Sequence, residues 1–171
     1  LDGADALMVT GETAMGKFPE KVIQVLTRVI EETESAINYQ DYYITHGNKH
    51  LNTAQAISHA ACSVAYDQDI KILITMTHSG STARMVSRYR PAARIIAMTP
   101  IEEISRQLSI VWGIMPIVIN EYNLSSEIQD VANAVLSREE ILNDGEKYVI
   151  TGGVPVGVPG TTNYVSVFKF A

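Results

Sequence analysis

Residues 70–82 read Ile-Lys-Ile-Leu-Ile-Thr-Met-Thr-His-Ser-Gly-Ser-Thr, and this stretch decides the fold. Residues 70–76 form an apolar run of strand length, which is typical of a strand buried on both faces. From Ser79 the sequence favours a helix to Arg88, ended by Pro91. A buried strand that leads directly into a helix predicts a β-α unit of an α/β domain.

The same alternation continues toward the end of the chain. The expected elements are a strand at 94–98, a helix at 101–111 opened by Thr99 and Pro100, a strand at 114–119, a helix capped by Ser125 or Ser126, and strands at 147–151 and 164–170. Such alternation predicts a mostly parallel sheet covered on both faces. The last two strands are joined by a loop too short for a crossover, so they should be antiparallel. Pro116 suits an edge strand or a strand start. The predicted fold is a three-layer α/β/α domain with a five-stranded sheet.

The chain before residue 53 has a different character. Residues 5–9 are predicted to form a short buried strand, followed by a glycine-bounded turn at 11–16 and a helix from about 19 to 38. Residues 39–52 break the pattern and are interpreted as a linker. A further helix is expected from an N-cap at Thr53 to about residue 66. The predicted divisions are therefore 1–38, 39–52 and 53–171.

Composition narrows the function. Hydrophobic residues make up 46% and charged residues 19% of the 171 residues, so the chain can bury a core. The net charge of −6 argues against nucleic-acid binding, and no apolar run approaches the ~20 residues of a membrane helix. Cys62, the single cysteine, is expected to be a buried apolar residue in a reducing cytoplasm. The start Leu1-Asp2-Gly3 and the absence of a leader indicate a piece excised from a longer cytoplasmic protein.

Two loops are candidate binding sites. The segment 77–82 places hydroxyls, backbone amides and a glycine at the start of a helix, which favours a phosphate or carboxylate. The alternative is an ordinary serine-capped helix. The loop 152–163 is rich in glycine and proline, and it follows a strand whose carboxyl end should face the first loop. Its alternative is a connecting hairpin without a ligand.

Other polar residues have simpler interpretations. His46 and His50 are four apart, but Gly47 and Asn48 interrupt any helix, so surface histidines are expected rather than a metal site. The three arginines near the end of the helix at 79–88 complement its dipole, with an anion or subunit contact as the alternative. These residues are Arg84, Arg88 and Arg90.

Several motifs resemble those of one enzyme family. Residues 1–23 resemble the last strand and turn of the pyruvate kinase barrel, whose pattern is D-G-x-D-x-x-M-L-S-G-E-T-A-x-G-x-[YF]-P. Further matches follow in order: Ser79-Gly80-Ser81-Thr82-Ala83, Arg88-Tyr89-Arg90-Pro91, Ile95-Ile96-Ala97-Met98-Thr99-Pro100, Leu108-Ser109-Ile110-Val111-Trp112-Gly113, Gly153-Val154-Pro155-Val156-Gly157 and Gly160-Thr161-Thr162-Asn163. The resemblance spans the chain and implies that 1–38 ends a TIM barrel, whereas 53–171 is the carboxy-terminal allosteric and oligomerisation domain.

The resemblance implies a role in glycolysis. The family transfers a phosphoryl group from phosphoenolpyruvate to ADP with Mg²⁺ and usually K⁺, and the lysine and acidic ligands involved belong to earlier barrel strands. Thr10 and Glu12 would belong to the rim of the active site, with Thr10 at a position where the family usually has serine. The chain alone is therefore expected to hold no metal and to be inactive.

The resemblance also implies an effector site. An effector phosphate would be held by Thr77, Ser79, Gly80, Ser81 and Thr82, with a loop at Gly157, Gly160 and Thr161 closing over it. The first loop lacks the basic residue of many fructose-1,6-bisphosphate-responsive members, and the second lacks their Trp and Arg. We therefore expect a sugar monophosphate or AMP rather than the bisphosphate. The Val-Pro-Val-Gly form of the second loop resembles bacterial members, and the family implies a homotetramer. The alternatives are a free-standing phosphate-binding domain of the same fold and an oligomerisation module with an empty pocket.

Overall fold

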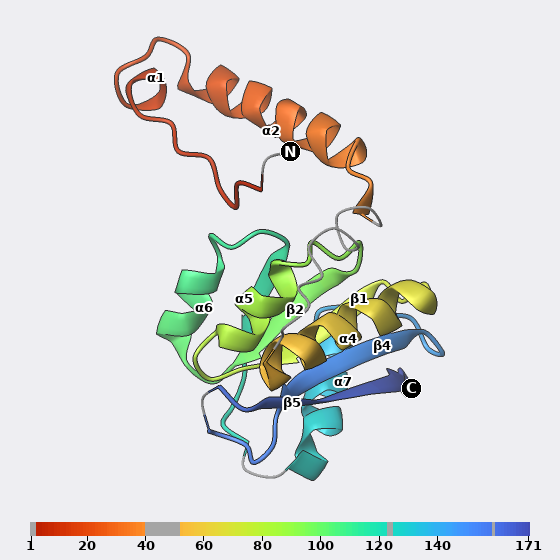
Figure 1. The fold of residues 1–171 in the computed structure, drawn as a ribbon. Coiled ribbons are helices and arrows are strands. Elements are labelled where there is room, and N and C mark those ends of the chain that lie inside the picture. The colour runs from red at the N-terminus through yellow and green to blue at the C-terminus, as the bar shows by residue number, and fades with distance from the viewer. Residues whose placement is uncertain (1–2, 40–51, 123–124, 159) are drawn as a thin grey trace.

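The computed structural model describes residues 3–39, 52–122, 125–158 and 160–171 (Figure 1). The predictions for His46, His50 and most of the linker lie outside these residues. The elements are α1 (Gly11–Ala14), α2 (Pro19–Ser35), α4 (Thr53–Asp67), β1 (Ile72–Met76), α5 (Ser81–Ser87), β2 (Arg94–Thr99), α6 (Glu102–Leu108), β3 (Ile114–Val118), a 3-10 turn (Ser125–Glu127), α7 (Ile128–Arg138), β4 (Lys147–Gly153) and β5 (Thr162–Lys169).

The sheet has five strands and is mostly parallel with one antiparallel pair, as predicted. Its order is β3-β2-β1-β4-β5, with β3 at an edge as Pro116 suggested. The pairs β1–β2, β1–β4 and β2–β3 are parallel, and β4–β5 is antiparallel. The chain passes from β1 to β2 and then to β3 at one edge of the sheet. It then crosses back to β4, which lies on the other side of β1. The strand order therefore reverses between β1 and β4, which is where α/β sheets commonly bind ligands.

Helices cover both faces of the sheet, and this confirms the three-layer prediction (Figure 1). Because side chains alternate along a strand, Ile72 and Ile74 pack on one face and Leu73 on the other. The first face packs against α7 through Ile128 and Leu136. The opposite face packs against α4 and α5, and a smaller cluster joins α5 and β2 to α6. Cys62 is buried in this second layer, as predicted.

Helix starts differ from the sequence expectations by one or two residues. Helix α4 is capped by Asn52 rather than Thr53, because Asn52 and Gln55 each accept a hydrogen bond from the other's backbone amide. Helix α5 begins at Ser81 rather than Ser79 because residues 77–80 form a turn, with Gly80 in the left-handed region at φ 77°. Within the described ranges, no helix is long and apolar enough to span a membrane.

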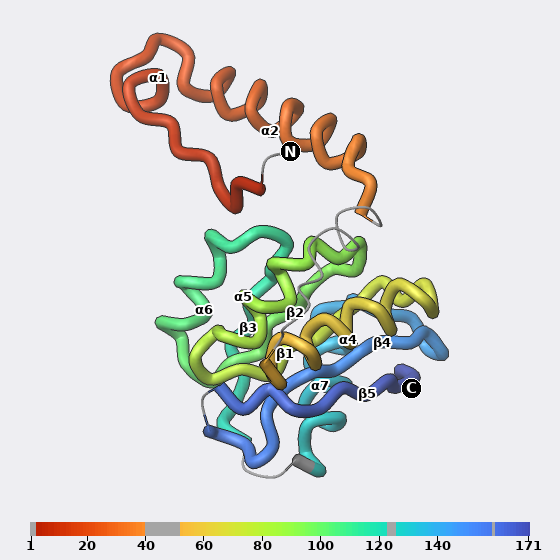
Figure 2. The backbone as a smooth tube through the Cα atoms, in the orientation of Figure 1, coloured from red at the N-terminus to blue at the C-terminus, as the bar shows by residue number. Residues whose placement is uncertain are grey.

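Residues 3–39, hereafter the N-terminal segment, form a separate lobe of the backbone beside the α/β unit (Figure 2), and side chains of Arg90 and Trp112 reach it from that unit. The predicted strand at 5–9 is absent, and residues 6–10 form no regular element. A strand requires a neighbour to accept and donate backbone hydrogen bonds, and the described chain offers none at this position. Helix α2 is present, but none of its side chains is buried by the residues that the structure describes.

Candidate functional site

The turn after β1 is built from its own hydroxyls. The Thr77 amide donates to the Met98 carbonyl of β2, and the Thr77 hydroxyl accepts from the Gly80 amide at 2.9 Å. A side chain at Gly80 would require a rare backbone conformation, and its Cβ would lie 3.3 Å from both Ile104 and Leu108. Glycine therefore allows the chain to turn closely over α6 before α5 begins.

The loop between β4 and β5 is held at its base. The Asn163 side chain accepts from the Val154 amide at 2.9 Å and donates to the Val154 carbonyl at 2.6 Å. Farther along, the Thr161 hydroxyl donates to the Val158 carbonyl. Gly157 and Gly160 have left-handed backbones at φ 82° and 80°, with no atoms near the place of a Cβ. The loop is thus fixed at its base and open around its two glycines.

The two loops meet at the carboxyl edge of β1 and β4. Thr82 of α5 and Thr162 of β5 share a buried hydrogen bond of 2.6 Å between their hydroxyls. Above this bond lies a cavity of about 20 Å³. It is lined by Met76, Thr77, His78, Ser79, Ser81, Thr82, Tyr122, Gly153, Gly157, Val158, Gly160, Thr161 and Thr162. The structure therefore brings the predicted residues of both loops together, with Gly80 just behind the lining.

The lining residues differ in what they can offer a ligand. The hydroxyls of Thr77 and Thr82 are engaged within the protein, whereas Ser79 is exposed and Ser81 is partly exposed. Ser79 donates to the Ser81 hydroxyl at 3.1 Å, so these two side chains can turn together toward an anion. A cavity of this size admits about one water molecule. A phosphate group would require the loop at 154–161 to move outward.

Six lining residues were not among the predicted site residues: Met76, His78, Tyr122, Gly153, Val158 and Thr162. Four of them, His78, Gly153, Val158 and Thr162, nevertheless lie within the two candidate loops. Thr162 bonds Thr82, and its place directly after Gly160-Thr161 was an available signal. Tyr122 follows β3 and lies 6.1 Å from the His78 ring, measured between ring centroids. Burial raises the pKa of Tyr122 to about 12, so its phenol stays protonated at neutral pH. Because Tyr122 follows a third parallel strand, the rule that ligands gather at the carboxyl ends of strands pointed to it.

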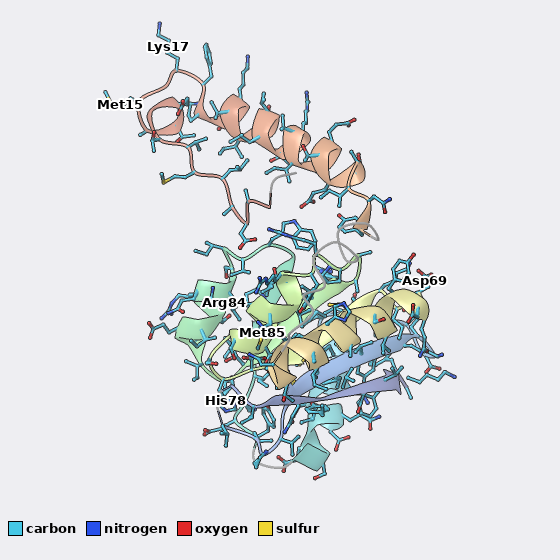
Figure 3. All side chains as sticks on the ribbon, in the orientation of Figure 1. Met15, Lys17, Asp69, His78, Arg84 and Met85 are labelled. Carbon is cyan, nitrogen blue, oxygen red and sulfur yellow. The ribbon has the colours of Figure 1, made fainter. Side chains whose placement is uncertain are left out.

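The predicted catalytic rim lies elsewhere. Thr10 and Glu12 are exposed at the start of α1, where the Thr10 amide donates weakly to the Glu12 carboxylate at 3.4 Å. Figure 3 shows Met15 and Lys17 at this outer end, whereas His78 lies on the α/β unit far from them. The structure thus does not bring Thr10 and Glu12 into the cavity formed by the two loops.

The three arginines do not act as one group. Arg84 and Arg88 are exposed at the end of α5. Arg90 is 7% exposed, and its guanidinium pairs with Asp5 of the N-terminal segment instead of complementing the helix end. A larger cleft of about 620 Å³ lies beside it, between residues 3–7, α2 and Trp112. Across the described ranges, no three His, Cys, Asp or Glu side chains are grouped so as to hold a metal ion.

Comparisons with known proteins agree with one another. The family model described as "Pyruvate kinase, alpha/beta domain" matches residues 55–168. A pyruvate kinase of Clostridium acetobutylicum is 36% identical over 97% of this chain and 35% of its own length. One from Sporosarcina psychrophila is 38% identical over 97% of this chain and 28% of its own length.

Solved structures point to the same family. The crystal structure of a pyruvate kinase from Cryptosporidium parvum matches 96% of this chain and 32% of that protein, with a TM-score of 0.85 and 31% identity. The same parasite's enzyme in complex with ADP matches 100% of this chain and 35% of that protein, with a TM-score of 0.82 and 33% identity. The chain thus spans about a third of the length of these relatives.

Proposed function

This chain belongs to the pyruvate kinase family, and from that premise we propose that it is the effector-binding and subunit-assembly part of a pyruvate kinase. The whole enzyme would transfer a phosphoryl group from phosphoenolpyruvate to ADP in cytoplasmic glycolysis. The observation that supports the regulatory role is the meeting of two hydroxyl- and glycine-rich loops where the strand order reverses.

Catalysis would belong to the part of the enzyme outside this chain. Phosphoryl transfer requires metal ions and a cation at the transferring phosphate. The described residues offer no cluster for Mg²⁺, and Thr10 and Glu12 alone supply only a hydroxyl and one carboxylate. Mg²⁺ and K⁺ would therefore bind to the rest of the enzyme. The purified chain should give no pyruvate from phosphoenolpyruvate and ADP in a lactate dehydrogenase-coupled assay, and robust turnover would overturn this part of the proposal.

The cavity between the loops would bind a phosphate group. Helix-start amides and the hydroxyls of Ser79 and Ser81 supply donors, and the open glycines at 157 and 160 allow the second loop to move outward. Among the described residues that line the cavity none is Lys or Arg, so it has little charge with which to bind two phosphates. A sugar monophosphate or AMP therefore fits better than fructose 1,6-bisphosphate.

Titration calorimetry with AMP, ribose 5-phosphate and fructose 1,6-bisphosphate tests this site. We expect the monophosphates to bind, and Ser79→Asp to abolish binding because it places a negative charge where the phosphate would lie. A matched control is Ser109→Asp, since Ser109 is an exposed serine at the end of α6. A clear preference for the bisphosphate would contradict the choice of ligand, and no binding by any of the three would contradict the site.

A second candidate function is assembly without an effector. The small volume of the cavity and the engaged hydroxyls of Thr77 and Thr82 favour it. In this reading the α/β unit contributes to a homotetramer and the cavity stays empty. Titration calorimetry with AMP separates the candidates: an effector site binds AMP and loses this binding in Ser79→Asp, whereas an assembly module binds no AMP in either protein. Sedimentation of the same two proteins is the control, because assembly should persist in both.

A further inference from the structure

Arg90 occupies an unusual place for an arginine. Its backbone lies in the left-handed region at φ 47°, which residues with a side chain rarely adopt. Its side chain is 8% exposed, although arginine is seldom buried unless it is paired. A buried arginine on a strained backbone indicates that its guanidinium has a specific task.

The guanidinium contacts the beginning of the N-terminal segment. Its Nη2 donates to the Gly3 carbonyl at 2.7 Å, to the Asp5 carboxylate at 2.6 Å and to the Ala4 carbonyl at 3.4 Å. These three acceptors come from consecutive residues that belong to no helix or strand. One side chain of the α/β unit thus holds a stretch of backbone that has no other regular support.

Trp112 contacts the other end of the N-terminal segment. Its indole Nε1 donates to the Glu34 carboxylate of α2 at 2.9 Å, and its ring lies 6.3 Å from the Tyr39 ring. Burial, and then the charge of Glu34, raises the pKa of Tyr39. The guanidinium of Arg90 lies 4.6 Å from the centre of the Trp112 ring, so the two contacts support each other.

Both residues are tied to the end of α5. The Arg90 amide donates to the Ser87 carbonyl at 2.9 Å, and the Ser87 hydroxyl donates to the Trp112 carbonyl at 2.6 Å. Ser87 itself is buried. Helix α5 has seven residues and begins beside the cavity formed by the two loops, so one short rigid element separates that cavity from Arg90.

The geometry points to Arg90 and Trp112 as a latch that fixes the N-terminal segment to the end of α5. Arg90 is the positioning residue of this latch: it holds residues 3–5, which lead along the chain to Thr10 and Glu12, at a defined place relative to the α/β unit. This role does not depend on what the cavity binds, or on whether it binds anything.

Trp112 makes the latch observable because it is the single tryptophan of the chain. An energy acceptor attached through Met8→Cys reports the distance from Trp112 to the N-terminal segment, since Met8 is 87% exposed and Cys62 is buried away from thiol reagents. Time-resolved transfer should give a narrow distance distribution in the otherwise unchanged chain. We expect Arg90→Lys, which loses the planar fork, to broaden that distribution at least twofold.

Two further variants make the result decisive. Arg88→Lys changes an exposed arginine two residues away and should leave the distribution narrow. Asp5→Ala removes an acceptor that is 51% exposed, so it tests the same contact without disturbing a core if Arg90→Lys fails to fold by circular dichroism. Broadening in either latch variant, with Arg88→Lys unchanged, supports the latch. A distribution as narrow as that of Arg88→Lys in every latch variant that folds overturns it.

Discussion

The hydroxyl pair Thr82–Thr162 joins the two loops of the candidate site, and both residues are buried. Replacing Thr82 by Val keeps its shape but leaves the Thr162 hydroxyl buried without this partner, which should cost about 1–3 kcal/mol of unfolding free energy. The double variant Thr82→Val/Thr162→Val removes both polar groups and should recover much of that loss. Urea unfolding of the unchanged chain, of the single variants Thr82→Val and Thr162→Val, and of the double variant measures the coupling. Strictly additive losses would show that the two hydroxyls do not act as a pair.

The buried thiol of Cys62 makes the free energy of unfolding depend on pH in the alkaline range. Burial raises the pKa of its thiol from the usual 9.0 to about 12 in the folded chain. The unfolded chain therefore loses this proton at lower pH than the folded one. The contribution of this thiol to stability is fully present below pH 9 and is lost as the pH rises toward 12. The slope contributed by one such group is at most about 1.4 kcal/mol per pH unit.

The comparison that isolates this effect is Cys62→Ala. We expect this variant to be less stable at pH 7 but to lose stability less steeply between pH 9 and 10, before the ordinary tyrosine pKa of 10.0 is reached. Thermal unfolding at several pH values gives both slopes. Equal slopes for the two proteins would mean that the buried thiol is not the group responsible.

At the scale of elements, the cap of α4 carries a direct prediction. Asn52 and Gln55 form a reciprocal capping box, so Asn52→Ala should destabilise the α/β unit by about 1 kcal/mol. Thr53→Ala is the matched control: Thr53 is exposed at the first helical position, and because alanine is the better helix former its replacement should be neutral or stabilising by a few tenths of a kcal/mol. Chemical unfolding distinguishes Asn52 from Thr53 as the cap, and a larger loss for Thr53→Ala would reverse the assignment.

The elements also show how far sequence patterns reach. The apolar runs of β1 and β2 predicted buried parallel strands because strands covered on both faces need apolar residues at nearly every position. The first residue of α5 was harder to predict from the sequence. Ser79, Gly80 and Ser81 all suit a helix start, and only the Thr77–Gly80 hydrogen bond with the left-handed Gly80 decides that the helix begins at Ser81. Such boundaries depend on three-dimensional contacts.

The candidate site was predictable in outline for a similar reason. A parallel sheet places the loops after β1 and β4 at one edge, so their meeting followed from topology. The sequence did not predict which hydroxyls remain available to a ligand, because Thr82 pairs with Thr162, a residue 80 positions away. The role of Arg90 was equally hidden: beside Arg84 and Arg88 it resembles one of three helix-end cations, whereas its partner is Asp5 at the beginning of the chain.

For the whole molecule, the N-terminal segment shows that an apolar sequence pattern alone does not form a strand. Residues 5–9 have the pattern of a buried strand, yet Leu7 and Met8 are 56% and 87% exposed. The pattern specifies a side-chain environment, but a strand also needs neighbours for its backbone. Relatives about three times as long match this chain over nearly its full length.

The exposed apolar side chains of the N-terminal segment predict how this chain behaves in solution. Helix α2 exposes Ile23 and Val25 by 51% and 58%, beside further exposed apolar residues at Val29 and Ile30. Apolar surface of this extent favours self-association and dye binding. Replacing both Ile23 and Val25 by Glu should lower the fluorescence of bound 1-anilinonaphthalene-8-sulfonate severalfold and reduce concentration-dependent association in sedimentation. Neither side chain belongs to a core cluster, so the unfolding of the α/β unit should not change.

The control is Ile101→Glu, an isoleucine of the α/β unit that is 42% exposed just before α6. Because it lies away from the N-terminal segment, its replacement should leave dye binding and association nearly unchanged. Equal effects of the α2 and Ile101 variants would show that self-association and dye binding are not specific to the exposed apolar residues of α2.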